Sequence, residues 1–94
     1  MKNIYEKAVK LVGYNGSTEE SIEYYDSMQD YRNDTQYDTD DDFNESVRSA
    51  FNIEPSEVKG PIIVLDRIGS VDGEIFTSED DEDYILDAIQ EYFK

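Results

Sequence analysis

Cysteine, histidine and tryptophan are absent from this 94-residue chain. Without cysteine there is no disulfide framework, thiol nucleophile or zinc–thiolate site, and nothing points to an oxidising compartment. Without histidine the commonest general base and the commonest transition-metal ligand are both missing. We therefore expect a protein that is not an enzyme, binds no metal and needs no cofactor.

Long hydrophobic runs are also missing. No apolar run approaches the roughly 20 residues that a membrane-spanning helix needs. The first twelve residues are amphipathic and mixed in charge, unlike the basic patch and apolar core of a signal peptide. The sequence therefore predicts a cytoplasmic protein.

Acidic residues dominate the composition. There are 24 Asp and Glu against 8 Lys and Arg, which gives a formal net charge of −16. Repulsion among these carboxylates works against a compact state. However, 8 tyrosines, 4 phenylalanines and a good supply of Ile, Val and Leu are more than a solvated tail usually carries. We expect one folded domain over residues 1–94 with a thin core.

Hydrophobic spacing predicts an α+β fold with three N-terminal helices, a short antiparallel β-hairpin and a C-terminal helix. The stripe of the first helix, which Gly13 would cap, contains Ile4, Ala8, Leu11 and Val12. Ser17 and Glu20 resemble a capping box for a second helix, which either stops near Arg32 or runs on toward Asp38. Asp42 and Glu45 form another capping box, and a third helical stripe follows it: Phe43, Val47, Ala50 and Phe51.

The second half of the chain begins with the connector "EPSEVKGP". The runs "IIVLDRI" and "EIFT", separated by "GSVDG", read as two strands of a hairpin. Ser78 would then cap the last helix, whose first turn is rich in acids, as the helix dipole favours. Its buried face would contain Ile85, Ile89, Tyr92 and Phe93.

The acids of the predicted second helix fall in one row at helical spacing: Glu19, Glu23, Asp26, Asp30, Asp34 and Asp38. Tyr24, Tyr25, Met28 and Tyr31 lie on the opposite side. Along the helix axis these acids would be spaced by roughly 5.7 Å on average. One DNA strand carries a phosphate about every 3.4 Å of duplex axis, and because the strand winds around the axis the two spacings are comparable.

The last helix repeats this arrangement with Asp80, Asp83, Asp87 and Glu91, facing away from Ile85, Leu86, Ile89 and Phe93. A solvated helix face also places its acids outward, and charge runs usually mark such faces. A surface made only for solubility would nevertheless mix both signs, whereas eleven acids from Glu19 to Glu45 meet only Arg32. We therefore predict partner binding by both rows together with Asp40, Asp41 and Asp42.

Calcium binding is the main alternative for this acidic stretch. Asp38, Asp40 and Asp42 occupy the first three alternating positions of an EF-hand loop. The sixth position is Phe43 instead of glycine and the twelfth is Ser49 instead of glutamate, so the turn and the bidentate ligand are lacking. Direct nucleic-acid binding is disfavoured by the sign of the charge.

A small acidic domain with carboxylate rows through "EESIEYYDSMQDYRND" and "EDDEDYILDAIQEYFK" resembles the DNA-mimic inhibitors of phages and mobile elements, of the antirestriction or anti-CRISPR type. The resemblance implies a basic DNA-binding protein as partner, such as a host nuclease, restriction or defence enzyme, or nucleoid protein. It implies competitive exclusion of DNA, electrostatically steered association and, for a phage protein, action in the host-cell cytoplasm.

Two other functions remain open. An immunity protein or antitoxin that neutralises a basic nuclease toxin would also be small and acidic, but would concentrate its affinity in a few anchor residues. An acidic structural or regulatory adaptor would use its charge for solubility. Tyr24, Tyr25 and Tyr31 are expected in the core, whereas Tyr37 could lie at an interface. A homodimer that aligns acidic faces also stays open.

Overall fold

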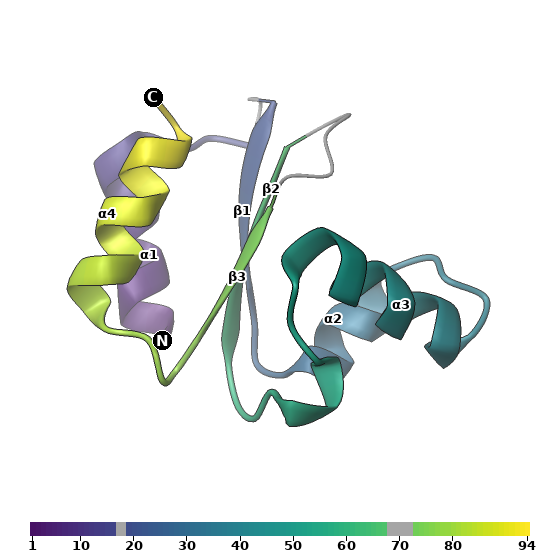
Figure 1. Ribbon diagram of the computed structural model, residues 1–94. Coiled ribbons are helices and arrows are strands. Elements are labelled where there is room, and N and C mark those ends of the chain that lie inside the picture. Colours follow the sequence, from purple (N-terminus) through teal and green to yellow (C-terminus); the bar gives the residue numbers. More distant parts are fainter. Residues whose placement is uncertain (17–18, 68–72) are drawn as a thin grey trace.

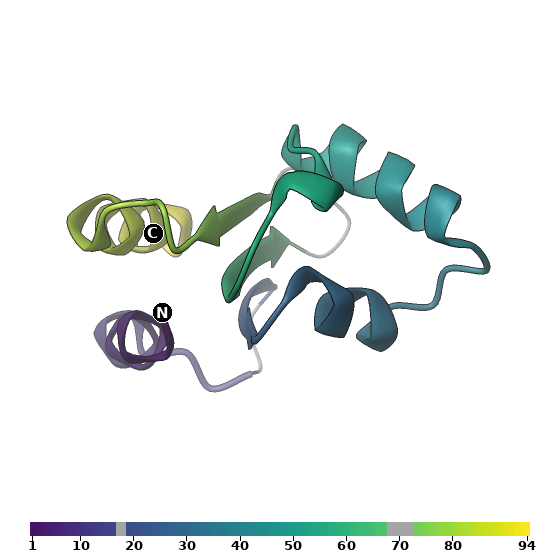
Figure 2. The ribbon, with the colours of Figure 1, turned by 90° about the horizontal axis from the view of Figure 1, so that it is seen from below.

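The computed structural model describes residues 1–16, 19–67 and 73–94. The elements along the chain are α1 (Lys2–Val12), β1 (Glu20–Tyr25), α2 (Met28–Asp34), α3 (Asp40–Phe51), the 3-10 helix η1 (Pro55–Glu57), β2 (Ile62–Arg67), β3 (Glu74–Thr77) and α4 (Glu82–Tyr92). The protein is α+β, as predicted. The sheet forms a middle layer, with α1 and α4 on one face and α2 and α3 on the other (Figures 1 and 2).

The sheet is antiparallel and has the strand order β1-β2-β3. Its central strand β2 is covered on both faces, so Ile62, Ile63, Val64 and Leu65 are all at most 3% exposed. This explains the continuous apolar run in the sequence, since a strand that is buried on both faces does not alternate between polar and apolar residues.

Side chains that alternate along the strands divide the core into two clusters. Toward α1 and α4 the sheet contributes Ile22, Ile63, Leu65 and Phe76, which pack with Ala8, Ile85 and Ile89. Toward α2 and α3 it contributes Ile62, Val64 and Ile75, which pack with Met28, Phe43 and Val47. Each helix layer is therefore held to the sheet by its own apolar cluster.

The predicted second helix is wrong in its first half, because Glu20–Tyr25 forms strand β1. Pairing with β2 covers an edge of the central strand and places Ile22 opposite Leu65, where it is 1% exposed. A helix at this position would leave that edge of β2 unpaired. Ser17 of the predicted capping box lies outside the described residues, and Glu20 starts the strand.

Helix α2 begins after Ser27, whose hydroxyl accepts a hydrogen bond from the Asp30 amide at 3.1 Å. Serine is among the preferred N-cap residues, so Ser27 favours the start of a helix at this point. The helix ends at Asp34, so the prediction of a stop near Arg32 is close, and an extension to Asp38 is wrong.

The first and third predicted helices are confirmed, but Leu11 of the first stripe is exposed. Gly13 ends α1 in the left-handed conformation with φ 67°, and its amide donates to the Val9 carbonyl. Helix α3 begins earlier than expected, at Asp40, because Thr39 and not Asp42 is its N-cap. The Thr39 hydroxyl accepts from the Asp42 amide at 3.1 Å.

The β2–β3 hairpin and helix α4 are also confirmed, although most of the predicted "GSVDG" turn lies outside the described residues. The predicted Ser78 cap is wrong, because α4 begins at Glu82 after Asp81. The residues before it form a turn in which Asp80 Oδ2 accepts from the Thr77 amide at 2.9 Å and the Asp80 amide donates to the Thr77 carbonyl at 3.1 Å. Within the described ranges no helix is long and apolar enough to cross a bilayer.

Candidate partner-binding surface

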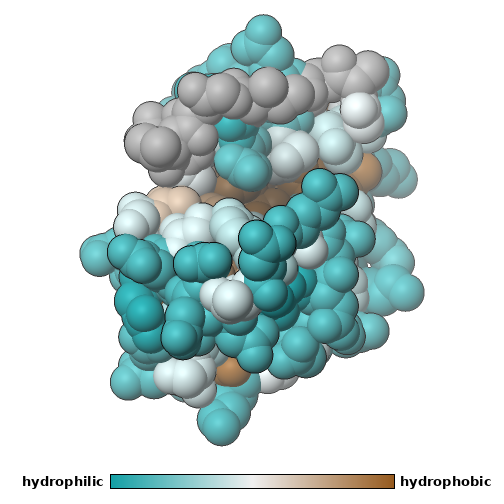
Figure 3. Space-filling view, turned by 90° about the vertical axis from the view of Figure 1, so that its right-hand side faces the viewer, coloured by the Kyte–Doolittle hydropathy of each residue, from teal (hydrophilic) through white to brown (hydrophobic). Residues whose placement is uncertain are grey.

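Most acids of the middle of the chain lie in the layer formed by α2 and α3. We call the exposed surface of residues 26–45 the α2–α3 face. Its exposed carboxylates are Asp26, Asp30, Asp34, Asp38, Asp40, Asp41, Asp42 and Glu45. Figure 3 shows this side of the molecule largely in the hydrophilic colour, with hydrophobic atoms visible mainly in a hollow.

The six acids from Glu19 to Asp38 do not form one helical row, so this part of the sequence prediction is wrong. Glu19 precedes β1, Glu23 lies on it, and Asp26 lies between β1 and α2. Only Asp30 and Asp34 share a helix, and Asp38 belongs to the linker before α3. All six are nevertheless exposed. The phosphate-like spacing is therefore lost, while the exposure of the charge is retained.

The second predicted row is present in part. Asp83, Asp87 and Glu91 are exposed on α4 at positions i, i+4 and i+8, away from the buried Ile85 and Ile89. Asp80 does not belong to this row, because it lies in the turn before α4 and its carboxylate binds the Thr77 amide. Helix α4 packs on the opposite face of the sheet from α2 and α3 (Figures 1 and 2). The two acidic regions are therefore not neighbouring rows.

The charge on the α2–α3 face is mostly not neutralised. Among its eight exposed acids only Asp40 forms an ion pair with a described residue, with Arg32 at 3.0 Å. The remaining ion pairs of the described chain are elsewhere: Lys7–Glu82, Arg48–Glu54, Arg67–Glu20 and Lys94–Glu91. The face therefore presents a field of one sign.

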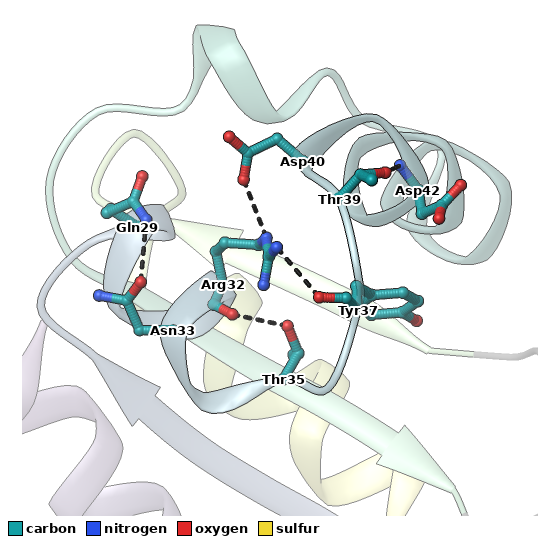
Figure 4. Close-up of polar contacts among 8 residues, drawn as sticks. All are labelled: Gln29, Arg32, Asn33, Thr35, Tyr37, Thr39, Asp40 and Asp42. Atoms are coloured by element: carbon teal, nitrogen blue, oxygen red, sulfur yellow. Dashed lines mark hydrogen bonds and ion pairs between the residues drawn. The ribbon is translucent and has the colours of Figure 1, made fainter.

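Arg32 is turned inward and connects α2 to the start of α3 (Figure 4). Its side chain is 18% exposed, its Nε donates to Asp40 Oδ1 at 3.0 Å, and its Nη2 donates to the Tyr37 carbonyl at 3.1 Å. The guanidinium lies 5.7 Å from the ring centroid of Phe43. The only base among these acids thus holds the linker between the two helices.

Replacement of Arg32 by methionine should therefore release the linker. We expect a loss of about 1–3 kcal/mol in the free energy of unfolding, because charged hydrogen bonds are removed. Amide hydrogen exchange should accelerate in residues 35–42. Arg48→Met is the matched control, because it removes the same charge and a bidentate pair with Glu54. Equal exchange in residues 35–42 of both variants would contradict this role of Arg32.

A phenol joins two carboxylates at the border of the face. The Tyr25 hydroxyl lies 2.5 Å from Glu23 Oε2 and 2.8 Å from Asp34 Oδ2, so it links β1 to the end of α2. A phenol has one proton and donates to only one of them at a time. Burial, followed by the hydrogen bonds to Glu23 and Asp34, raises the pKa of Tyr25 well above its usual value. The group therefore stays a neutral donor at physiological pH.

The aromatic residues beneath the acids form a connected row. Ring centroids are separated by 5.1 Å for Tyr25–Tyr31, 5.6 Å for Tyr31–Phe43 and 5.8 Å for Tyr37–Phe43. Burial, with a smaller contribution from the negative charge of Asp66, raises the pKa of Tyr31 to about 12. The expected packing of Tyr24, Tyr25 and Tyr31 against the core is confirmed. Tyr37 is 40% exposed, and its hydroxyl lies 2.6 Å from Ser46 Oγ.

A cavity of about 300 Å³ lies between α2, α3 and η1. Its lining residues are Met28, Gln29, Arg32, Asp40, Phe43, Asn44, Pro55 and Ser56. Sequence reasoning missed this feature, because it depends on how three separate segments are packed. No local pattern around Asn44 or Ser56 marks them as neighbours.

The carboxylates of the α2–α3 face are not grouped into a cluster with metal-ligand geometry. In the part of the chain that the structure describes, no three carboxylates are grouped closely enough to hold a metal ion. Phe43, at the sixth position of the EF-hand comparison, is 3% exposed in the core. No family model, curated protein or solved structure matches the chain.

Proposed function

We propose that this protein binds the basic nucleic-acid-binding surface of another protein and keeps nucleic acid away from it. The observation that supports this most directly is the α2–α3 face, where only Asp40 among eight exposed acids forms an ion pair with a residue that the structure describes. Like charges so close together reduce the stability of the fold. A surface selected for solubility alone would intersperse lysine and arginine among them.

The field of this face favours a cationic partner. Its only base, Arg32, is 18% exposed and paired with Asp40, so it contributes little positive potential outside the protein. A negative surface of this kind accelerates the approach of a basic protein and repels nucleic acid. Both effects weaken as salt is added, because the Debye length falls to about 8 Å at physiological ionic strength.

The size and total charge of the molecule support competition with a short duplex. The spacing of its acids does not, because the predicted helical row is not formed. The longest dimension of the molecule is 35 Å, which is the length of about 10 base pairs at roughly 3.4 Å each. Such a duplex carries about 20 phosphates, and the protein carries 24 acids. The mimicry that we propose is therefore one of charge and dimensions, with acids on both sides of the sheet.

This proposal places the protein with the DNA-mimic inhibitors of phages and mobile elements, acting in the cytoplasm. The partner would be a nuclease, a restriction or defence enzyme, or a nucleoid protein. The protein itself would supply no chemistry and no cofactor. Its effect would be to occupy a channel that DNA otherwise enters.

The test begins with capture from a low-salt cell lysate on the immobilised protein, followed by elution with duplex DNA. Each eluted protein is then mixed with fluorescently labelled duplex, and DNA binding is measured by anisotropy while our protein is added. We expect the labelled duplex to be displaced, with a potency that falls steeply as salt is raised. DNA binding that persists at saturating concentrations of our protein would overturn the proposal.

An immunity protein for a basic nuclease toxin is the second candidate. The cavity between α2, α3 and η1 and the exposed Tyr37 favour it, because they offer a few defined contacts in addition to charge. Such a protein would inhibit one nuclease and not others of equal net charge. Testing inhibition against several unrelated basic nucleases separates this candidate from a general DNA mimic.

A further inference from the structure

We propose that the cavity between α2, α3 and η1 receives one long cationic side chain, an arginine or a lysine, from the basic partner. This inference rests on the basic partner that the proposed function and the immunity-protein alternative share, and it specifies how that partner is held. It assigns a single anchoring contact within a surface that otherwise acts through its summed charge.

The floor of the cavity is apolar. Met28 is 8% exposed, Phe43 is 3% exposed, and Pro55 is buried. Arginine and lysine have apolar stems that pack on such surfaces while their charged ends remain near water. A floor of this kind therefore suits the stem of the side chain but not a compact hydrated cation.

The rim offers hydrogen-bond acceptors. Asp40 Oδ1 accepts from Arg32, whereas Asp40 Oδ2 has no hydrogen-bond partner among the described residues, and the side chain is 83% exposed. The Gln29 amide nitrogen donates to Asn33 Oδ1 at 3.0 Å, which leaves the Gln29 amide oxygen available. Asn44 adds a second amide oxygen on the α3 side. These groups can accept hydrogen bonds from a guanidinium or an ammonium.

Charge decides between a cationic and an anionic occupant. Arg32 also lines the cavity, but its charge is balanced by Asp40 and its Nη2 is bound to the Tyr37 carbonyl. Asp40 is the only carboxylate in the lining, and elsewhere the α2–α3 face carries seven further exposed acids and no other base. An incoming carboxylate or phosphate would meet this negative field, whereas a cation would be stabilised by it.

The size of the cavity fits one side chain. Pockets for small molecules range from about 300 to 1,000 Å³ and enclose most of the ligand. This cavity is at the lower limit, with about 300 Å³, and it opens onto the surface that we propose for binding. The cavity therefore has room for one long side chain inserted as an interface anchor.

The experiment uses blocked peptides of alternating glycine and arginine, or glycine and lysine, as probes. Asn44→Phe fills the cavity without changing the net charge, and Gln29→Phe fills it from the α2 side. Ser49→Phe is the matched control, since Ser49 is exposed on α3 and outside the cavity lining. Affinities come from calorimetry, and thermal unfolding shows that each variant is folded. The side-chain amide signals of Gln29 and Asn44 report the cavity directly by NMR.

We expect both cavity-filling variants to weaken peptide binding about tenfold, as for an anchor contact, and Ser49→Phe to bind like the original protein. The amide signals of Gln29 and Asn44 should shift on titration. The inference would be overturned if a filled variant bound as tightly as the control, or if a glycine–leucine peptide competed equally well. If neutralising the acids weakened peptide binding but filling the cavity did not, this inference would be wrong and the proposed function would still hold.

Discussion

Replacing Phe76 by alanine should leave the protein mostly unfolded in low-salt buffer and folded again in high salt. Phe76 lies on β3 opposite Ile63, is 0% exposed and contacts the cluster beneath α1 and α4. Removing a buried phenylalanine typically costs about 3–5 kcal/mol. Small domains have a total stability of about 5–15 kcal/mol, so this loss leaves a narrow margin.

Repulsion among the carboxylates, which depends on salt, determines whether the Phe76→Ala variant is folded or unfolded. At about 0.01 M salt the Debye length is roughly 30 Å, close to the 35 × 28 × 19 Å dimensions of the molecule, so most carboxylates repel one another. At about 1 M salt the length falls to roughly 3 Å, and only close neighbours interact.

Urea titrations at these two salt concentrations measure the effect. Leu11→Ala is the control, because it deletes an apolar side chain that is 55% exposed and should change stability by less than about 0.5 kcal/mol. A stability of Phe76→Ala that does not depend on salt would show that charge repulsion is not the opposing force.

Local patterns predicted the elements that carry their own signals. The stripe of α1 ends at Gly13, which adopts the required left-handed conformation, and the stripe of α3 places Phe43 and Val47 in the core. The apolar run of β2 and its pairing with β3 in a hairpin were also predicted from the sequence. In these segments the local preference agrees with the packing.

Strand β1 was missed because its sequence satisfies two periods at once. Glu19, Glu23, Asp26 and Asp30 fit a helix, but Ile22 and Tyr24 also alternate with Glu23 and Tyr25 as in a strand. The segment forms a strand because the central strand β2, with its apolar side chains, needs a neighbouring strand on each edge. This requirement cannot be read from the residues of the segment itself. The acids are spaced like a helical row in the sequence by chance, because they belong to a strand, a turn and a short helix.

The candidate site was predictable in its charge but not in its shape. Exposure of the acids followed from composition, because carboxylates are almost never buried without partners. The inward turn of Arg32 and the cavity beside it depend on the angle between α2 and α3 and on the position of Pro55. These are tertiary relations between segments up to about 27 residues apart, Met28 and Pro55.

Neutralising four acids of the α2–α3 face should weaken binding to a basic partner far more than neutralising four acids around α4. The first variant carries Asp30→Asn, Asp38→Asn, Asp41→Asn and Glu45→Gln; the second carries Glu79→Gln, Asp81→Asn, Asp83→Asn and Asp87→Asn. Each changes the net charge from −16 to −12. None of the eight residues forms an ion pair with a described residue.

An exposed ion pair across an interface contributes about 0.2–1 kcal/mol, so four together contribute roughly 1–4 kcal/mol, or about fivefold to several hundredfold in affinity. Calorimetry with the glycine–arginine peptide and with the captured partner measures this difference. In both variants the relief of repulsion is opposed by the loss of first-turn acids that favour the helix dipole, Asp30 and Asp41 in the first and Asp83 in the second. Urea titrations of both variants therefore accompany the binding measurements, so that weaker binding by a folded variant is not attributed to unfolding.

The comparison between the two variants separates three explanations of the acidity. Selective loss in the first variant would identify the α2–α3 face as the binding surface. Equal loss in both would mean that total charge governs binding, and the face would then have no special role. Unchanged affinity in both would favour an adaptor whose acids serve solubility, because exposed charges that meet a partner cannot be removed without slowing its association.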